Sequence, residues 1–317
     1  MTASRAAPII PWRRAALTWV LLVLLGRSGG VAAGDSVPAG PAHLNVGYSI
    51  QVFVDVDAEA RDAMKVWSDQ IVKRRFGEGT ARNLVFPDEA SLEAAFRRKE
   101  VDVAALIADE YVAIRHRVPM QPVFVPAHDG GVYQSVVLLV RRDAGFRSVL
   151  DLKSRSLCVS VQQGKTIHLK WLEILLMREG FRGTENFFSR VRETKGPSPA
   201  ILSVFFKQSD ACLTTLQAFR IASELNPQVG RELAPLAQSP EAAGAVIVFR
   251  ADLDETEKKK LMDVMGTLHG DAEGRQLLGL FRMSSLSPFR AEYLSAVEGF
   301  QKEHDDLDRR LARRVPK

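Results

Sequence analysis

From His43 onward, short apolar runs alternate with longer stretches whose apolar residues recur every three to four positions. Stretches 58–76 and 91–99 have the helical spacing, and Ser91 can cap the second helix. Three short runs have the length of buried strands: LNVGYS (44–49), NLVF (83–86) and VDVAALI (101–107). The first part of the chain therefore predicts a βαβαβ unit. The third run is apolar on both faces, which is typical of a central strand in a parallel sheet.

The pattern starts again further along the chain. Further strands are expected at 134–143, 156–161, 187–193, 209–215 and 243–253. Further helices are expected at 166–179, 199–207, 254–268, 271–280 and 290–303, followed by a charged amphipathic end. Runs 134–143 and 243–253 are long enough to cross between two lobes. We therefore predict an α/β fold of two doubly wound lobes joined by two crossing strands. Lobe one comprises 44–137 plus 247–317, and lobe two comprises 138–246.

The first 33 residues have the order of features found in a secretory signal peptide. Arg13 and Arg14 precede an apolar run at 15–25, and Val31-Ala32-Ala33 offers small residues for cleavage. Eleven apolar residues at ~1.5 Å each span only about half of a bilayer core. We therefore expect a cleaved leader on residues 1–33 and a periplasmic protein, with an uncleaved anchor as the alternative.

The charge balance changes once this leader is set aside. The whole chain has 43 basic and 38 acidic residues, and the leader holds four arginines and no acid. The remaining 39 bases against 38 acids give no basic surface for nucleic acid. Cys158 and Cys212 both lie in apolar runs, which favours two buried thiols over a disulfide. The six histidines are scattered without the spacing of metal ligands, so no metal site is expected.

The most distinctive string is Gly164-Lys165-Thr166, between a predicted strand and a predicted helix. A nucleotide-binding P-loop needs a glycine at position 159, where this chain has Val159, so a nucleotide site is not expected. A helix start still presents free N–H groups to an anion, and Gly164 allows close approach to the backbone. Lys165 adds a full positive charge. The alternative is that Thr166 only caps the helix and Lys165 is only solvated.

In doubly wound folds, ligands bind beyond the carboxyl ends of the strands. Applied to the predicted strands, this rule selects the expected ligand-binding residues: Tyr48, Ser49, Asp109, Tyr111, Tyr133, Gln163, Gly164, Lys165, Thr166, Ser198 and Thr214. No nucleophile-elbow motif occurs, and adjacent carboxylates such as Asp109 and Glu110 point apart on a helix. His168 fits a helix surface. We therefore predict no enzyme and no cofactor.

Several segments together resemble the phosphate/phosphite/phosphonate-binding proteins of ABC importers. The matching segments are 91–106, 133–161, 209–215, 271–281 and 287–300. The resemblance implies the type II periplasmic binding fold and an exported protein that captures a small anionic ligand. It implies a partner that is the membrane permease of an ABC importer or a membrane sensor.

The resemblance is weaker in the loops. Family members that bind phosphonates carry a Ser-Thr-Ser-Gly-like loop where this chain has residues 163–166, so Lys165 would replace hydroxyl contacts with a charge. Two alternatives to import remain. One is a sensory or interaction protein that keeps the fold without transport, and the other is an enzyme that uses the Gly164-Lys165-Thr166 loop.

Overall fold

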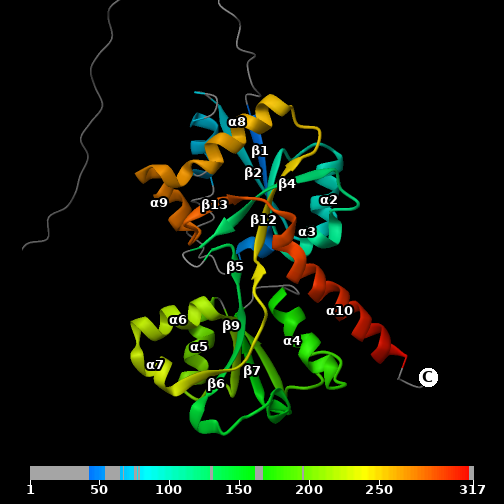
Figure 1. The fold of residues 1–317 in the computed structure, drawn as a ribbon, viewed down its shortest axis with the longest axis vertical. Coiled ribbons are helices and arrows are strands. Elements are labelled where there is room, and N and C mark those ends of the chain that lie inside the picture. The colour runs from blue at the N-terminus through cyan, green and yellow to red at the C-terminus, as the bar shows by residue number, and fades with distance from the viewer. Residues whose placement is uncertain are drawn as a thin grey trace, which may run out of the picture. The chain divides into compact units, whose positions relative to one another are not determined.

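The computed structural model describes residues 43–53, 65–66, 68–74, 77, 79–128, 131–160, 167–194 and 196–313. Within these ranges the chain forms a six-stranded sheet, a five-stranded sheet and a two-stranded ribbon (Figure 1). The predicted leader lies outside the described residues. Within the described ranges, no helix combines the length and the apolar composition that a membrane span requires.

The first sheet contains the elements predicted for the start of the chain. Its strand order is β13-β4-β12-β3-β1-β2. The parallel strands are β1 (His43–Ser49), β2 (Thr80–Phe86) and β3 (Val103–Ile107). Three further strands join the sheet through antiparallel pairings: β4 (Met120–Ala127), β12 (Ala245–Arg250) and β13 (Ser285–Pro288). The helices of this part are α2 (Glu89–Arg97), α3 (Ala108–Ile114), α8 (Glu255–Gly266) and α9 (Ala272–Leu280). As predicted, β3 lies inside the sheet, between β12 and β1.

The second sheet has the order β10-β6-β9-β7-β8. Its strands are β6 (Val136–Arg141), β7 (Ser156–Val159), β8 (Arg190–Glu193), β9 (Ala211–Thr215) and β10 (Leu233–Gln238). Its helices are α4 (Ile167–Arg178), α5 (Pro197–Phe205), α6 (Leu216–Leu225) and α7 (Pro227–Glu232). The sequence pattern did not predict α6, α7 or β10. No residue of α6 is fully buried, although its apolar residues Leu216, Ala218, Phe219 and Ala222 pack against a core cluster of the second sheet.

Two segments connect the sheets, as predicted. They meet in a short ribbon of β5 (Tyr133–Gln134) and β11 (Ala242–Ala243), where the two strands pair antiparallel. The predicted run at 134–143 begins in this ribbon and lies mostly in β6 of the second sheet, and the run at 243–253 begins there and lies mostly in β12 of the first. The long apolar runs are therefore sheet strands, and the crossing is confined to a few residues. The lobe boundaries stay a prediction.

In each sheet, an aspartate just before an inner strand forms hydrogen bonds with the neighbouring parallel strand. Asp102, just before β3, accepts hydrogen bonds from the Asn45 backbone N–H at 2.9 Å and from Arg250 at 3.1 Å. Asp210, just before β9, accepts from the Ser156 backbone N–H at 2.8 Å and from its hydroxyl at 2.7 Å. Each carboxylate satisfies a backbone N–H at the start of the neighbouring parallel strand, where the strand ladder leaves it open.

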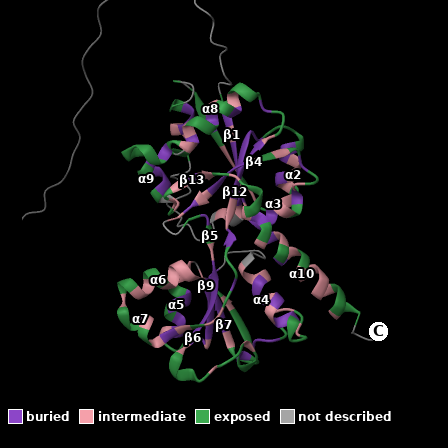
Figure 2. Ribbon diagram, in the orientation of Figure 1, coloured by how far each residue is buried: buried purple, intermediate pink, exposed green. Residues whose placement is uncertain are grey.

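Apolar side chains fill both faces of the sheets, and buried residues concentrate in the strands (Figure 2). One cluster takes residues from both sheets, among them Leu106 of β3 and Leu138 of β6, and also Phe300 of the last helix, α10 (Ser295–Ala312). Cys158 and Cys212 are buried free thiols, as predicted. In α2 the N-cap is Asp88, not Ser91, because the Asp88 carboxylate accepts from the Ser91 backbone N–H at 2.8 Å.

The shared cluster makes a stability prediction. Leu138→Ala removes a fully buried side chain and should lower the free energy of unfolding by about 2–5 kcal/mol in a urea titration. The matched control is Leu225→Ala at the end of α6, where the side chain is 83% exposed and the change should stay within about 0.5 kcal/mol. Equal losses in both variants would contradict the described packing.

Candidate functional site

Polar side chains meet where two parallel strands of the first sheet end. β1 ends at Tyr48 and Ser49, and β3 is followed at once by Asp109 and Glu110 of α3. The two strands are parallel neighbours, so their carboxyl ends lie at the same edge of the sheet. This is the edge at which doubly wound proteins bind ligands.

The two acids of this edge have different partners. Glu110 is 8% exposed, and its Oε1 accepts a hydrogen bond from the Ser49 hydroxyl at 2.7 Å. Asp109 is 5% exposed, and its Oδ2 lies 3.6 Å from Lys170 Nζ of α4. α4 lies between β7 and β8 of the second sheet in the chain, so this ion pair joins the two parts of the fold. The adjacent carboxyl groups point to different neighbours, as their helical spacing predicts.

Burial changes the ionisation of both acids. Removal from water raises the pKa of Glu110 to about 7, and the nearby Asp109 and Glu89 add to this while the Ser49 hydrogen bond opposes it. Burial also raises the pKa of Asp109, although the charge of Lys170 opposes the shift. Two buried ionised carboxylates would repel one another and any anionic ligand. We therefore expect this edge of the first sheet to carry less negative charge than two ionised carboxylates, Asp109 and Glu110, would give it.

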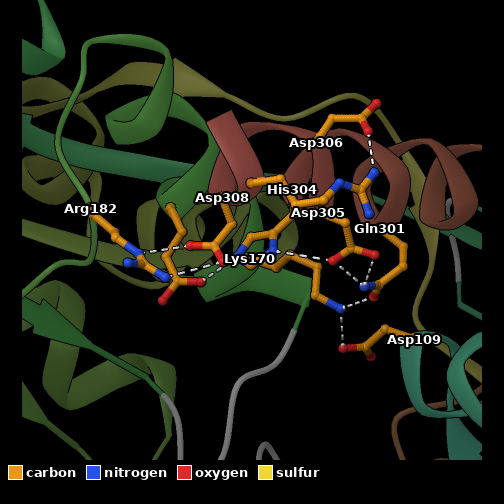
Figure 3. Close-up of polar contacts among 10 residues, drawn as sticks. Asp109, Lys170, Arg182, Gln301, His304, Asp305, Asp306 and Asp308 are labelled. Atoms are coloured by element: carbon orange, nitrogen blue, oxygen red, sulfur yellow. Dashed lines mark hydrogen bonds and ion pairs between the residues drawn. The ribbon is translucent and has the colours of Figure 1, made fainter. Parts of the chain in front are cut away.

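The last helix, α10, also contacts the Lys170 side chain. Its ammonium donates to Gln301 Oε1 of α10 at 2.5 Å, and Gln301 in turn donates to the Asp305 carboxylate at 2.9 Å (Figure 3). The Lys170 side chain is only 13% exposed. Its contacts with α3 and α10 hold the charge beside Asp109.

The contact between α4 and α10 continues away from this edge as a row of polar pairs, which we call the α4–α10 seam. His304 Nε2 lies 2.9 Å from Glu173 Oε2. The remaining pairs are Arg178 with Glu303, and Arg182, four residues after the end of α4, with Asp308; both have two hydrogen bonds. Figure 3 shows Asp308 directed toward Arg182. Val297, Phe300, Leu307 and Leu311 of α10 pack against the shared apolar cluster beneath the pairs.

Other predicted ligand-binding residues lie elsewhere. Tyr111 is buried in the core, with its ring 6.4 Å from that of Phe289. Tyr133 of β5 packs edge-on against Tyr293 at 5.6 Å. Ser198 is exposed in the first turn of α5. No described contact brings these three residues to Ser49 or Asp109.

The remaining predicted ligand-binding residues are buried or lie outside the described part of the chain. Tyr48 is buried at the end of β1, and burial raises the pKa of its phenol. Thr214 of β9 is fully buried, and its hydroxyl has no hydrogen-bond partner within the described part of the chain. Gln163, Gly164, Lys165 and Thr166 lie outside the described residues, so their role stays a prediction.

Glu110, Lys170 and Gln301 are not among the residues predicted from the sequence. The burial of Glu110 is not visible from a helical pattern. Lys170 lies one turn after the Gly164-Lys165-Thr166 string, and a lysine there fits an exposed helix face as well as a buried one. The contact with Gln301 joins residues 131 positions apart, which no local pattern predicts.

A family model matches most of the chain. It is described as the periplasmic substrate-binding protein of a phosphonate ABC transporter, and it matches residues 62–294, well over half of the chain. The chain belongs to this family. Members of the family are periplasmic proteins that hand a captured ligand to an ABC transporter. The membership agrees with the resemblance found in the sequence. No curated protein matches the chain.

Solved structures of this family's fold align with most of the chain. XAC2383 from Xanthomonas citri bound to chloride ion aligns with a TM-score of 0.61 at 16% identity, covering 86% of this chain and 100% of that one. PhnD1 from Prochlorococcus marinus in complex with methylphosphonate has a TM-score of 0.61 at 17% identity, covering 84% and 99%. The aliphatic sulphonate binding protein SsuA from Escherichia coli has a TM-score of 0.52 at 16% identity, covering 88% and 95%. These similarities establish the type II periplasmic binding fold of this family member.

We expect the ion pair between Lys170 and Asp109 to stabilise the folded protein. Lys170→Met leaves the buried Asp109 carboxylate without its cation and should lower the free energy of unfolding at pH 8 by about 3 kcal/mol. Asp109→Asn in the same chain should restore most of the loss. The control is Lys259→Met on the exposed face of α8, which should be neutral. If the Lys170 variant is as stable as the control in urea titrations, the ion pair does not neutralise Asp109.

Proposed function

We propose that this protein captures a small oxyanion, of the phosphonate, phosphate or sulfonate class, at the carboxyl ends of the strands and delivers it to the permease of an ABC importer. The observation that carries the proposal is the family match across residues 62–294. The fold supports it, because both sheets have parallel strands whose carboxyl ends can line a ligand site. We infer that the protein reaches the periplasm through its leader and binds without catalysing a reaction.

The charges at this edge of the first sheet are compatible with an anionic ligand. Asp109 has Lys170 as a counterion, so this pair adds little net charge to the edge. The hydroxyl of Ser49 lies on the same edge. On the opposite side, α4 begins directly after the predicted Gly164-Lys165-Thr166 string, and the start of a helix attracts an anion. We infer that the ligand lies between these two groups of residues.

The short ribbon supports a capture mechanism. β5 and β11 are only two residues long each and connect the two sheets. Hinges of closing proteins are a few residues that take up the change in backbone angles. We infer that the sheets close on the ligand about this ribbon, and that lobe one is 44–137 plus 247–317 with lobe two at 138–246.

The proposed anion site is tested by its lysine. Lys165→Ala should weaken binding of methylphosphonate or another oxyanion found by thermal-shift screening by roughly 10- to 150-fold. A hydrogen bond to a charged group is worth ~1.5–3 kcal/mol, and each 1.4 kcal/mol is tenfold. Calorimetric titration measures the change.

Two controls sharpen this test. Lys165→Arg keeps the charge and alters the geometry, so it should bind more tightly than the alanine variant. Lys259→Ala removes an exposed charge from α8 and should bind like the wild type. If Lys165→Ala also binds like the wild type, the oxyanion is bound elsewhere.

A further inference from the structure

Glu110 has one satisfied oxygen and one open oxygen. Its Oε1 accepts from the Ser49 hydroxyl at 2.7 Å, whereas its Oε2 is buried and has no hydrogen-bond partner among the described residues. An unsatisfied buried carboxylate oxygen is costly, so buried polar groups in native proteins normally have partners. The open oxygen lies at the edge of the sheet at which doubly wound proteins bind ligands, so a ligand is the partner that we expect for it.

The charges that surround Glu110 are mostly negative. Asp109 precedes it on α3, and Glu89 of α2 adds further negative potential. From α4, the ammonium of Lys170 is directed at Asp109, and His168 also acts on Asp109. From β1, Ser49 offers only a hydroxyl. No lysine or arginine within the described ranges forms an ion pair with Glu110. Burial and these negative neighbours favour the neutral carboxyl group, and they outweigh the hydrogen bonds from Ser49 and from the Ile107 backbone, which favour the ionised form.

We propose that Glu110 binds the ligand in its protonated form, with Oε1 accepting from Ser49 and the Oε2 hydroxyl donating to an oxygen of the ligand's anionic group. An ionised carboxylate has only acceptors and would repel an oxyanion, whereas a protonated one supplies a donor. Burial raises the pKa of this group to about 7, so a proton is available near neutral pH. This inference rests on the proposed function, because it requires an oxyanion at this edge.

The proposal fixes the sign of a pH dependence. The ligand binds only the protonated carboxyl, so the affinity is full below the pKa and falls as pH rises through it. Above a pKa of about 7, each pH unit should weaken binding by about tenfold. Glu110→Gln keeps the size and a donor but cannot ionise. Its binding should match the wild type within about threefold at pH 6 and should not share the decline.

The test is calorimetric titration of the full mature chain with methylphosphonate and with methanesulfonate from pH 6 to pH 9. The readout is the Kd of the wild type divided by the Kd of Glu110→Gln at each pH, because this ratio cancels the ligand's own titration. The ratio should rise by about 100-fold between pH 6 and pH 9. At pH 8, titrations in two buffers of different ionisation enthalpy should also show more proton uptake by the wild type than by the variant.

A control variant and two different negative outcomes separate the role of Glu110 from the proposed function. Glu93→Gln removes a carboxylate that Arg97 and Arg117 already neutralise, so it should keep the wild-type profile. A ratio that stays constant from pH 6 to pH 9 overturns the role of Glu110 but leaves the capture of oxyanions intact. If neither the wild type nor Glu110→Gln binds any oxyanion, the proposed function itself fails and this inference fails with it.

Discussion

The structure depends on how two acids are buried at the carboxyl end of β3. Asp109 and Glu110 are both more than nine-tenths buried, and neither can keep its charge there without compensation. Asp109 obtains a cation, Lys170, from α4, the helix that connects β7 and β8 of the other sheet. Glu110 has no such cation within the described chain, and we propose that a proton takes its place. The Lys170 ion pair and the proposed proton on Glu110 both make the edge suitable for an anion, because they reduce its negative charge and leave hydrogen-bond donors there.

The position of Lys170 links this edge to the last helix. Gln301 of α10 holds the ammonium, and the α4–α10 seam continues with His304 and the two arginine pairs. The arginine pairs are about half exposed, so each contributes at most about 1 kcal/mol. The apolar residues beneath them contribute more per side chain because they are removed from water. Beside the ribbon of β5 and β11, α10 is therefore a further contact between the two sheets, held mainly by apolar packing.

The sequence predicted most of the strands and helices, but not α6, α7 or β10, and not the contacts between distant residues at the edge of the first sheet. Apolar runs located β1, β2, β3, β7 and β9, because strand and helix periods are local. The two connecting segments were located, but a long apolar run does not reveal at which residue it leaves one sheet. Among the predicted ligand-binding residues, Ser49 and Asp109 lie at one edge of the first sheet, where the strand-end rule places them. Tyr111 obeys the same rule but packs in the core, because helix rotation decides which side chain faces the edge. Lys170 and Gln301 required a contact between distant segments.

The central claim is that the buried charge at this edge is neutralised, so that an anion can bind. Carbon-13 NMR of protein labelled at the glutamate carboxyl carbons measures it directly, with Glu110→Gln used to assign the Glu110 signal. We predict that the signal has the chemical shift of a protonated carboxyl at pH 6 and titrates near pH 7 in the free protein. A saturating oxyanion should move that midpoint to higher pH. A Glu110 signal that is ionised at pH 6, with or without the oxyanion, would contradict the account.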